Sequence, residues 1–532
     1  MRVIRYPFAL GLLAVVLGVS RPSSGQEGPG GADPDPARPE KPVLASDAST
    51  AEFKKALDLQ KQKKWAAAKK ALESFLVKWP DSVHKDEAEE RSDDNAYLGT
   101  EVLHRSGPSE RRIDVAVMGD GFTIDAPDQA LEEKWAKLCL DVLWSEASYG
   151  EYRDYFNYYF VRLASLEEGV DPALSPEEKK KIEEKNKTRT RKRKTEYSTA
   201  LDCKAAGPQG QVMADRRLVY HWLKVGAREV PGADDDGLVI AFARFGILGM
   251  GGGGVANVGR PDRSVTVHEF GHAFGGLLDE YAVNPTKPPY EVRAANASMT
   301  NDPAKVPWAH FLEKKVPGVG VFEGGATFKQ GVWKPARSCA MNSAGNMNYC
   351  PVCREAVILR IYNHCSPIDA AGPVAERVTV RAGQTADLFV VPMRPEKHDV
   401  EVQWWIERLK DAPPEVEVAP KTTGGDDGDD RRGRFEEMMR DRGFGRFTGG
   451  KRGREDRKAY DAPPPGAPFS NASVVKRVAG KDETRHVLMA GRLEPGWHRI
   501  TAEVRDPTPW VLKDSKHLLE ERRSWFVNVL PK

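Results

Sequence analysis

The chain has 532 residues, which is long enough for about two to four domains and a large core. Charged residues make up 30% of the chain and the net charge is +2, so no global field of one sign favours nucleic acid as a partner. The aromatic share of 8% is ordinary for a globular protein.

Residues 1–25 have the pattern of a secretory signal peptide. Arg2 and Arg5 precede an apolar run, Phe8–Gly18, that is too short to span a bilayer comfortably. An uncleaved membrane anchor is the alternative interpretation. No later stretch of about 18 apolar residues follows. The sequence therefore predicts an exported protein, extracellular or periplasmic, with no membrane span once the signal is removed.

Two further segments precede the central domain. Residues 26–49 are rich in Pro, Gly, Asp and Ala and predict a disordered linker. Residues 50–90 predict a helical hairpin, because apolar residues recur at helical spacing until Pro80 ends the pattern. The hairpin resembles one tetratricopeptide-type repeat. A lone repeat cannot bury both of its faces, so it either packs on the next domain or binds a protein partner.

Residues 91–370 predict an α/β domain. Ile113–Met118, Tyr155–Leu166 and Asp236–Phe245 read as buried strands, Pro127–Trp144 reads as a helix, and a further helix begins near Arg263.

Three features of this domain have competing interpretations. Asp120 follows the first strand in a Gly-Asp-Gly turn, where it is either catalytic or, more commonly, an acceptor for backbone amides. The charged run 176–194 is a solvated insertion or a patch for an acidic partner. Gly249–Gly254 is not followed by Gly-Lys-Ser/Thr, so it predicts a flexible loop beside a substrate cleft and not a phosphate site.

The segment from His268 to Tyr281 carries the chemistry. In His268-Glu269-x-x-His272 a helix places both imidazoles on one face, one turn apart, where they can reach one Zn²⁺ at about 2.0–2.1 Å. Glu269 lies beside them, close enough to reach a water on the metal. The opposing interpretation is two ordinary helical histidines, and the preceding strand and the glycine-rich break after His272 weigh against it.

The third ligand is expected just after this helix. A catalytic zinc has three protein ligands and one open position. Gly275 and Gly276 allow the helix to end and the chain to turn sharply. Asp279 is the predicted third ligand, and Glu280 is the alternative.

Several segments, in order, resemble the IgA-peptidase family of secreted bacterial zinc metallopeptidases, which have a metzincin-like active site. They are Ile113–Phe122, Tyr152–Phe160, His268–Tyr281, Val321–Ala326, Cys339–Asn342 and Cys350–Glu355. The resemblance implies zinc-dependent hydrolysis of peptide bonds, although not cleavage of immunoglobulin. It also makes Met341 the candidate for a methionine turn beneath the zinc, with an ordinary core methionine as the alternative.

The chain departs from the metzincin pattern at one point. That pattern has a single glycine three residues after the second histidine and its third ligand six residues after it. Here the acid comes seven residues after His272.

The six cysteines form an even set behind a signal peptide, which favours disulfides. Six cysteines allow 15 pairings, so none is assigned. Cys350-Pro-Val-Cys353 also reads as a redox pair or as half of a structural zinc site. His310 lies alone in a Pro-rich region without predicted regular structure; it could be a ligand, but a lone histidine in a loop is more often structural or solvent-exposed.

Residues 371–532 predict an immunoglobulin-like β-sandwich of short strands, with a disordered insertion at 422–468. Such a domain is expected to be a spacer or docking module.

Taken together, these features predict a secreted zinc-dependent endopeptidase that acts on a protein or peptide substrate. His268, His272 and Asp279 hold one Zn²⁺, Glu269 is the general base, and Tyr281 is a candidate to stabilise the oxyanion. Part of residues 26–105 is a candidate zymogen segment over the cleft. The alternative is a non-catalytic exported binding or scaffold protein with a structural zinc.

Overall fold

The computed structural model describes residues 46–190, 192–206, 211–230, 237–246, 248–342, 348–384, 387–413, 473–478, 486–489 and 493–532. The predicted signal peptide (1–25), most of the predicted linker (26–49) and the predicted insertion (422–468) lie outside the described residues.

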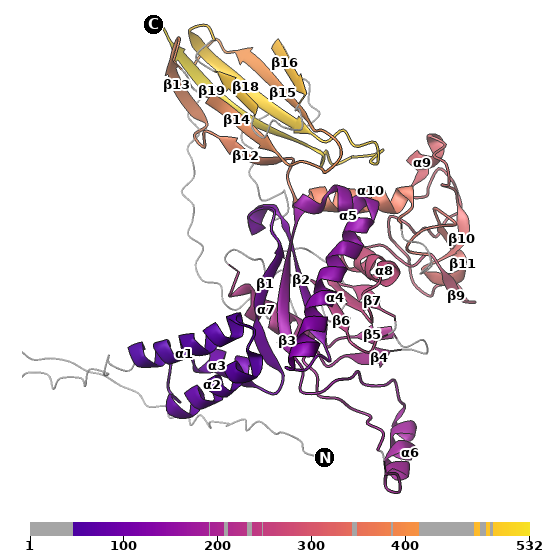
Figure 1. Cartoon of the computed structure of the whole chain (residues 1–532). Coiled ribbons are helices and arrows are strands. Elements are labelled where there is room, and N and C mark those ends of the chain that lie inside the picture. Colours follow the sequence, from indigo (N-terminus) through magenta and orange to yellow (C-terminus); the bar gives the residue numbers. More distant parts are fainter. Residues whose placement is uncertain are drawn as a thin grey trace, which may run out of the picture.

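A six-stranded sheet forms the centre of the molecule, in the order β1-β3-β2-β6-β8-β7 (Figure 1). Its strands are β1 (Ala96–His104), β2 (Ile113–Asp120), β3 (Phe156–Ala164), β6 (Leu238–Ala243), β7 (Met250–Gly252) and β8 (Val255–Val258). The four inner strands run parallel, and the edge strands β1 and β7 run antiparallel to them. The inner strands are almost entirely buried, as expected for parallel strands with helices on both faces.

Helices cover both faces of this sheet. Those on one face are α4 (Ala126–Ser145), α5 (Ala147–Glu151), α8 (Arg263–Ala273) and α10 (Pro351–His364), and α7 (Arg216–Ala227) covers the other. Successive side chains of β2 alternate between the faces: Val115 and Val117 join the core under α4, whereas Ala116 and Met118 join the core under α7. The result is a mixed α/β domain in which the strands and helices predicted for it are present.

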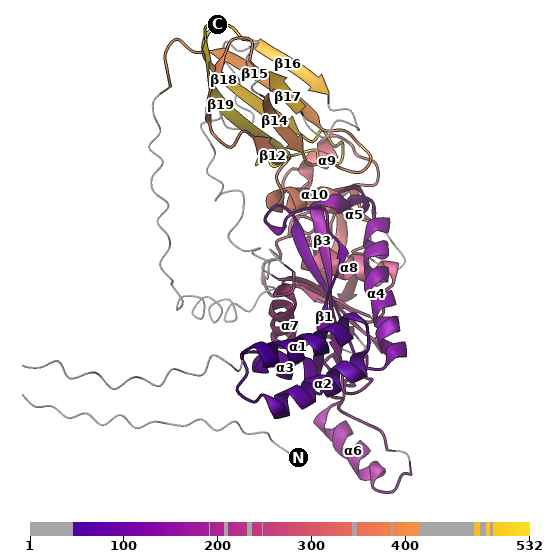
Figure 2. The same ribbon diagram turned by 60° about the vertical axis from the view of Figure 1, so that its left-hand side comes forward.

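Smaller elements follow the main strands and helices. They are α6 (Pro176–Asn186), β4 (Lys204–Ala206), β5 (Gln211–Met213), β9 (Ala282–Asn284), α9 (Ala309–Glu313), β10 (Phe322–Gly325), β11 (Thr327–Lys334) and the 3-10 turns Ser109–Arg111 and Arg153–Tyr155. Helix α6 buries no residue and projects from the body (Figure 2), as a solvated insertion would. The Pro-rich region 281–335, predicted to lack regular structure, contains the sheet β10-β11-β9. Within the described residues no helix is both long and apolar enough to cross a bilayer.

The N-terminal segment forms three helices: α1 (Ser46–Lys61), α2 (Trp65–Lys78) and α3 (Lys85–Ser92). They share a small core of their own, and Trp65 packs with Leu98 of β1. Arg91 is also paired with Glu229, just after α7. The helices therefore pack on the β1 edge of the sheet, opposite β7. The described part of the predicted zymogen segment does not cover the α8 side of the molecule.

The C-terminal segment forms two sheets, ordered β12-β14-β17 and β13-β19-β18-β15-β16. Their strands are β12 (Ile368–Gly372), β13 (Arg377–Arg381), β14 (Asp387–Pro392), β15 (Glu401–Arg408), β16 (Ser473–Val478), β17 (His486–Met489), β18 (Gly496–Arg505) and β19 (Glu520–Leu530). One apolar cluster draws on both sheets, including Leu388 from the first and Trp404 and Trp525 from the second. The two sheets therefore share one core.

A polar network joins the C-terminal segment to the α/β domain. Asp506 accepts hydrogen bonds of 2.7 Å from the hydroxyls of Tyr152 and Tyr362. His398 lies between two carboxylates, with Nδ1 at 2.7 Å from Glu151 Oε1 and Nε2 at 2.6 Å from Asp506 Oδ1. Burial lowers the pKa of His398, but the hydrogen bonds and charges of Asp506 and Glu151 outweigh it and raise the pKa overall.

This network predicts a pH-dependent stability. A raised folded-state pKa means that the stabilisation from His398 is complete below the unfolded value of about 6.5 and is lost as pH rises through the folded value. We expect the gap in melting temperature between the wild type and His398→Gln to be widest near pH 6 and to narrow toward pH 9. A gap that stays constant across this range would show that the imidazolium does not bridge the two carboxylates.

Candidate metal centre

Helix α8 places the two histidines. Asp262 caps its first turn by accepting a 2.9 Å hydrogen bond from Val265 N. Its apolar residues, such as Val267 and Phe270, are buried in the main core. The helix ends at Ala273, and Gly276 just beyond has φ +62°, a conformation that glycine adopts without strain. The chain can then turn back toward the face that carries the histidines.

Three ligand atoms converge there. His268 Nε2 and His272 Nε2 lie 3.2 Å apart, and Asp279 Oδ1 lies 3.0 Å and 3.1 Å from them. Four ligands at 2.0–2.1 Å from a tetrahedral zinc are separated by about 3.3–3.4 Å. The three atoms therefore nearly have the spacing of three corners of a zinc site. The side chains keep 13% to 19% exposure, so one side of the group faces solvent.

The second nitrogen of each ring fixes the ring orientation. His268 Nδ1 lies 2.8 Å from the carbonyl oxygen of Ala340, and His272 Nδ1 lies 2.6 Å from that of Leu277. Since a carbonyl only accepts, each Nδ1 carries a proton and donates it. In the neutral rings the Nε2 lone pairs then point at each other and at the carboxylate. At this spacing the three atoms need a proton or a cation between them, and a metal ion would fit both rings at once.

The charges at the site lead to the same conclusion. Burial lowers the pKa of His272, but its hydrogen bond to Asp279 and the charge of Asp279 outweigh this and raise it to about 9. Burial opposes ionisation of Asp279, yet the two histidines hold its pKa well below the usual range. The site thus strongly favours positive charge, and a divalent ion bound by neutral imidazoles would supply it.

Glu269 lies between α8 and β7. It is 6% exposed, and its Oε2 has no hydrogen-bond partner in the described part of the chain. A carboxylate oxygen of Glu269 also falls within 4.8 Å of both histidines. Burial raises the pKa of Glu269, and the two imidazoles and the Gly251 backbone only partly oppose this. Asp279 is held against the two histidines at 3.0 Å and 3.1 Å, whereas Glu269 keeps an oxygen without a partner among the described residues. Glu269 is therefore the carboxylate that is available to accept a proton.

The glycine-rich run 249–254, predicted as a flexible loop, contains an ordered strand instead. Residues 250–252 form β7, which pairs with β8 and lies along α8. A Cβ on Gly251 would lie 2.3 Å from the Glu269 carbonyl oxygen and 2.9 Å from His272 Cβ. A Cβ on Gly249 would lie 2.4 Å from Glu269 Cγ. These glycines are needed because the strand backbone approaches the helix so closely.

Glu280, the alternative third ligand, points elsewhere. It is fully buried beside Cys353, whose Sγ lies 3.1 Å from Glu280 Oε1. Its backbone N donates a 2.6 Å hydrogen bond to the Met341 carbonyl oxygen. Only Asp279 of the acidic pair reaches the histidines.

Met341 lies beneath α8. Its side chain is fully buried, and its Sδ would be 2.8 Å from a Cβ placed on Gly271. Its neighbour Ala340 provides the carbonyl that holds His268. The Met341 segment therefore packs against α8 at Gly271. The resemblance implied a methionine turn next to the same helix.

Tyr281 is close to the group of ligands. Its ring stacks on His268 with centroids 6.1 Å apart and an interplanar angle of 19°. Burial and the charge of Asp279 raise the pKa of its hydroxyl. Tyr281 therefore stays protonated at neutral pH and can donate a hydrogen bond.

Two other predicted candidates have structural roles. Asp120 is fully buried and accepts hydrogen bonds from the backbone N atoms of Leu201 and Cys203, at 2.8 Å and 3.0 Å. It binds backbone amides, though of a distant segment and not of its own turn. His310 is paired with Glu355 at 2.7 Å, away from the metal ligands.

The predicted disulfides are not found. All six cysteines lie in the described part of the chain, and each is a buried free thiol. Three of them, Cys339, Cys350 and Cys353, gather around Glu280.

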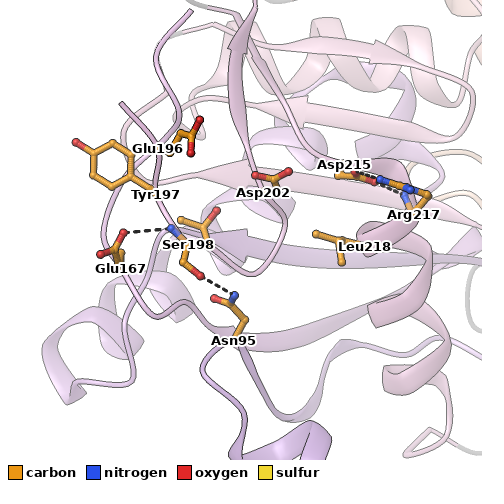
Figure 3. A pocket seen from close by; sticks show the side chains of 10 residues that line it. Asn95, Glu167, Glu196, Tyr197, Ser198, Asp202, Asp215, Arg217 and Leu218 are labelled. Carbon is orange, nitrogen blue, oxygen red and sulfur yellow. Dashed lines mark hydrogen bonds and ion pairs between the residues drawn. The ribbon is translucent and has the colours of Figure 1, made fainter. Parts of the chain in front are cut away.

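A cavity of about 780 Å³ lies elsewhere, between the end of β3 and the start of α7 (Figure 3). Four carboxylates line it: Glu167, Glu196, Asp202 and Asp215. Each is already paired with a lysine or arginine, so the cavity offers no comparable cation site.

No protein-family model matches the chain, and no curated protein matches it. The resemblance to the IgA-peptidase family therefore remains a prediction from the sequence motifs.

The close contact between β7 and α8 is testable with a pair of strand glycines. We expect Gly251→Ala to force β7 away from α8, to destabilise the protein by about 1–3 kcal/mol and to weaken zinc binding. Gly325→Ala is the control, because its Cβ would meet only ordinary contacts at 3.5 Å or more. We expect it to stay within about 0.5 kcal/mol of the wild type. Calorimetry and zinc titration measure both variants, and wild-type behaviour of Gly251→Ala would refute the contact.

Proposed function

We propose that the protein is a secreted zinc-dependent endopeptidase. The convergence of His268 Nε2, His272 Nε2 and Asp279 Oδ1 within 3.2 Å of one another, open to solvent on one side, supports this most directly. A purely structural zinc would have four protein ligands. Here the buried carboxylate of Glu269 stands beside three ligands, which is the arrangement that catalysis needs.

A zinc ion at this position would polarise the scissile carbonyl and lower the pKa of a water from 15.7 to about 7. Glu269 accepts the proton of the attacking water as general base, since burial has raised its proton affinity. The same carboxyl group then donates the proton to the leaving amine. The neutral hydroxyl of Tyr281 can donate a hydrogen bond to the oxyanion that develops at the carbonyl.

The neighbouring strand favours a peptide as the substrate. Within the described residues β7 forms a ladder only with β8, so it is an edge strand that runs along the histidine helix, although β5 bridges Leu248 just before it and Arg216 donates to the Gly252 carbonyl oxygen. An extended peptide can bind such an edge through main-chain hydrogen bonds. This would place a peptide bond from the middle of the substrate next to Glu269. Binding would depend little on the identity of the substrate side chains.

Glu269→Gln tests the role of the general base. We expect this variant to keep its zinc and to lose about 10²–10⁴-fold in the rate of cleavage of a mixed peptide library, followed by mass spectrometry. Glu291→Gln, which changes an exposed carboxylate paired with Arg293, is the control and should cleave normally. Zinc binding without any cleavage that depends on Glu269 would support the non-catalytic scaffold alternative.

Tyr281→Phe tests the oxyanion role. Loss of one donor to an oxyanion costs about 10²–10³-fold in kcat. We expect a loss of this order with the substrate KM and the zinc content unchanged, because the hydroxyl acts on the transition state. An unchanged kcat would assign the oxyanion to another donor.

A further inference from the structure

We propose that Glu280, Cys339, Cys350 and Cys353 bind a second, structural zinc ion behind the histidine site. The proposal concerns metal binding alone and does not depend on the proposed peptidase activity.

The four ligand atoms have suitable spacing. All lie within 4.8 Å of one another. Cys339 Sγ and Cys353 Sγ are 3.7 Å apart, and Glu280 Oε1 lies 3.1 Å from Cys353 Sγ and 3.9 Å from Cys350 Sγ. Zinc–sulfur bonds of 2.3 Å in a tetrahedron separate two sulfurs by about 3.8 Å, and a sulfur from a carboxylate oxygen by about 3.5 Å.

The group is completely enclosed. Cys339, Cys353 and Glu280 are 0% exposed, and Cys350 is 4% exposed. Glu280 Oε2 has no hydrogen-bond partner among the described residues. A buried carboxylate with an unpartnered oxygen, set against three sulfurs, is costly unless a proton or a cation neutralises it. Zinc would remove this cost.

The local structure supports the cluster from several directions. Cys350 is the N-cap of α10 and Cys353 lies in its first turn, where the partial positive charge of the helix end stabilises thiolates. Asn296 Nδ2 donates a 3.1 Å hydrogen bond to Glu280 Oε1, and Cys350 N donates a 3.3 Å hydrogen bond to Cys339 Sγ. Hydrogen bonds of this kind orient ligands in known metal sites.

Zinc fits this group better than a disulfide does. The Sγ–Sγ distance of 3.7 Å is far from the 2.03–2.05 Å of a disulfide and close to the separation across a metal. A disulfide would leave one thiol and the carboxylate without a function. A donor set of three sulfurs and one oxygen at tetrahedral spacing favours zinc, and four protein ligands leave no open position for catalysis.

A zinc ion bound by the cysteine cluster would also hold the ligands of the histidine site in position. Glu280 follows Asp279 directly, and Cys339 precedes Ala340, whose carbonyl oxygen holds the His268 ring. One ion would therefore join the third-ligand segment, the Met341 segment and the start of α10. We expect loss of this ion to weaken zinc binding at the histidine site as well.

Metal content and cobalt spectra of the full-length protein test the proposal. We expect about two zinc ions per chain in the wild type. The variant His268→Ala/His272→Ala should keep one, and after cobalt exchange it should show strong thiolate-to-cobalt charge-transfer absorption. Cys350→Ser/Cys353→Ser should lose that absorption, whereas Cys139→Ala, which alters a buried cysteine outside the cluster, should keep both ions.

Other outcomes decide the question too. A wild type with one zinc ion that the double histidine variant loses would overturn the proposal and leave the peptidase hypothesis standing. A disulfide among Cys339, Cys350 and Cys353, found by alkylation and peptide mapping, would also overturn it. If the double cysteine variant fails to fold, the cobalt spectrum of the double histidine variant still decides. One ion with thiolate character in that spectrum, without peptidase activity in the wild type, would uphold this proposal and refute the other.

Discussion

One electrostatic constraint governs the site: three electron-rich atoms are held about one zinc-ligand spacing apart in a site that is mostly closed to water. The Nδ1 atoms of His268 and His272 are committed to backbone carbonyl oxygens, so their Nε2 atoms face Asp279 and each other. Without a metal ion, a proton has to separate these atoms, and the raised pKa of His272 reflects this. With a metal ion they form three corners of a tetrahedron, and the fourth corner is open for a reacting group.

The surrounding fold holds these atoms in place. Helix α8 lies between β7, whose glycines let the backbone touch Glu269 and His272, and the Met341 segment, which lies beneath Gly271. Both carbonyl acceptors come from chain segments outside the helix, one at Leu277 and one at Ala340. The C-terminal sheets contact the α/β domain through Asp506 and His398, away from this helix, which fits a docking or spacer role.

Much of the site could be predicted from the sequence because the information was local. The spacing of His268, Glu269 and His272 specifies a helix with both rings on one face. The choice between Asp279 and Glu280 could not be made from local spacing, because it depends on Cys339, Cys350 and Cys353, which surround Glu280 only after folding. The disulfides expected from an even number of cysteines are not found either, because all six cysteines are buried free thiols and three of them lie outside this cluster.

Other differences have the same origin. The run 249–254 looked flexible because glycine is permissive, yet its glycines serve a close approach to α8 that no local pattern reveals. Helix α3 was not predicted as a separate helix, since Ala88 is its only buried apolar residue. Its Arg91 is instead buried and paired with Glu229, 138 residues away. Contacts between distant segments decided each of these features.

The most direct measurement is a crystal structure of the protein purified with zinc, with anomalous diffraction collected on both sides of the zinc absorption edge. We expect an edge-dependent peak about 2.0–2.2 Å from His268 Nε2, His272 Nε2 and Asp279 Oδ1, with a non-protein oxygen as the fourth ligand. The absence of a peak at this position, or a fourth ligand supplied by the protein, would contradict this expectation.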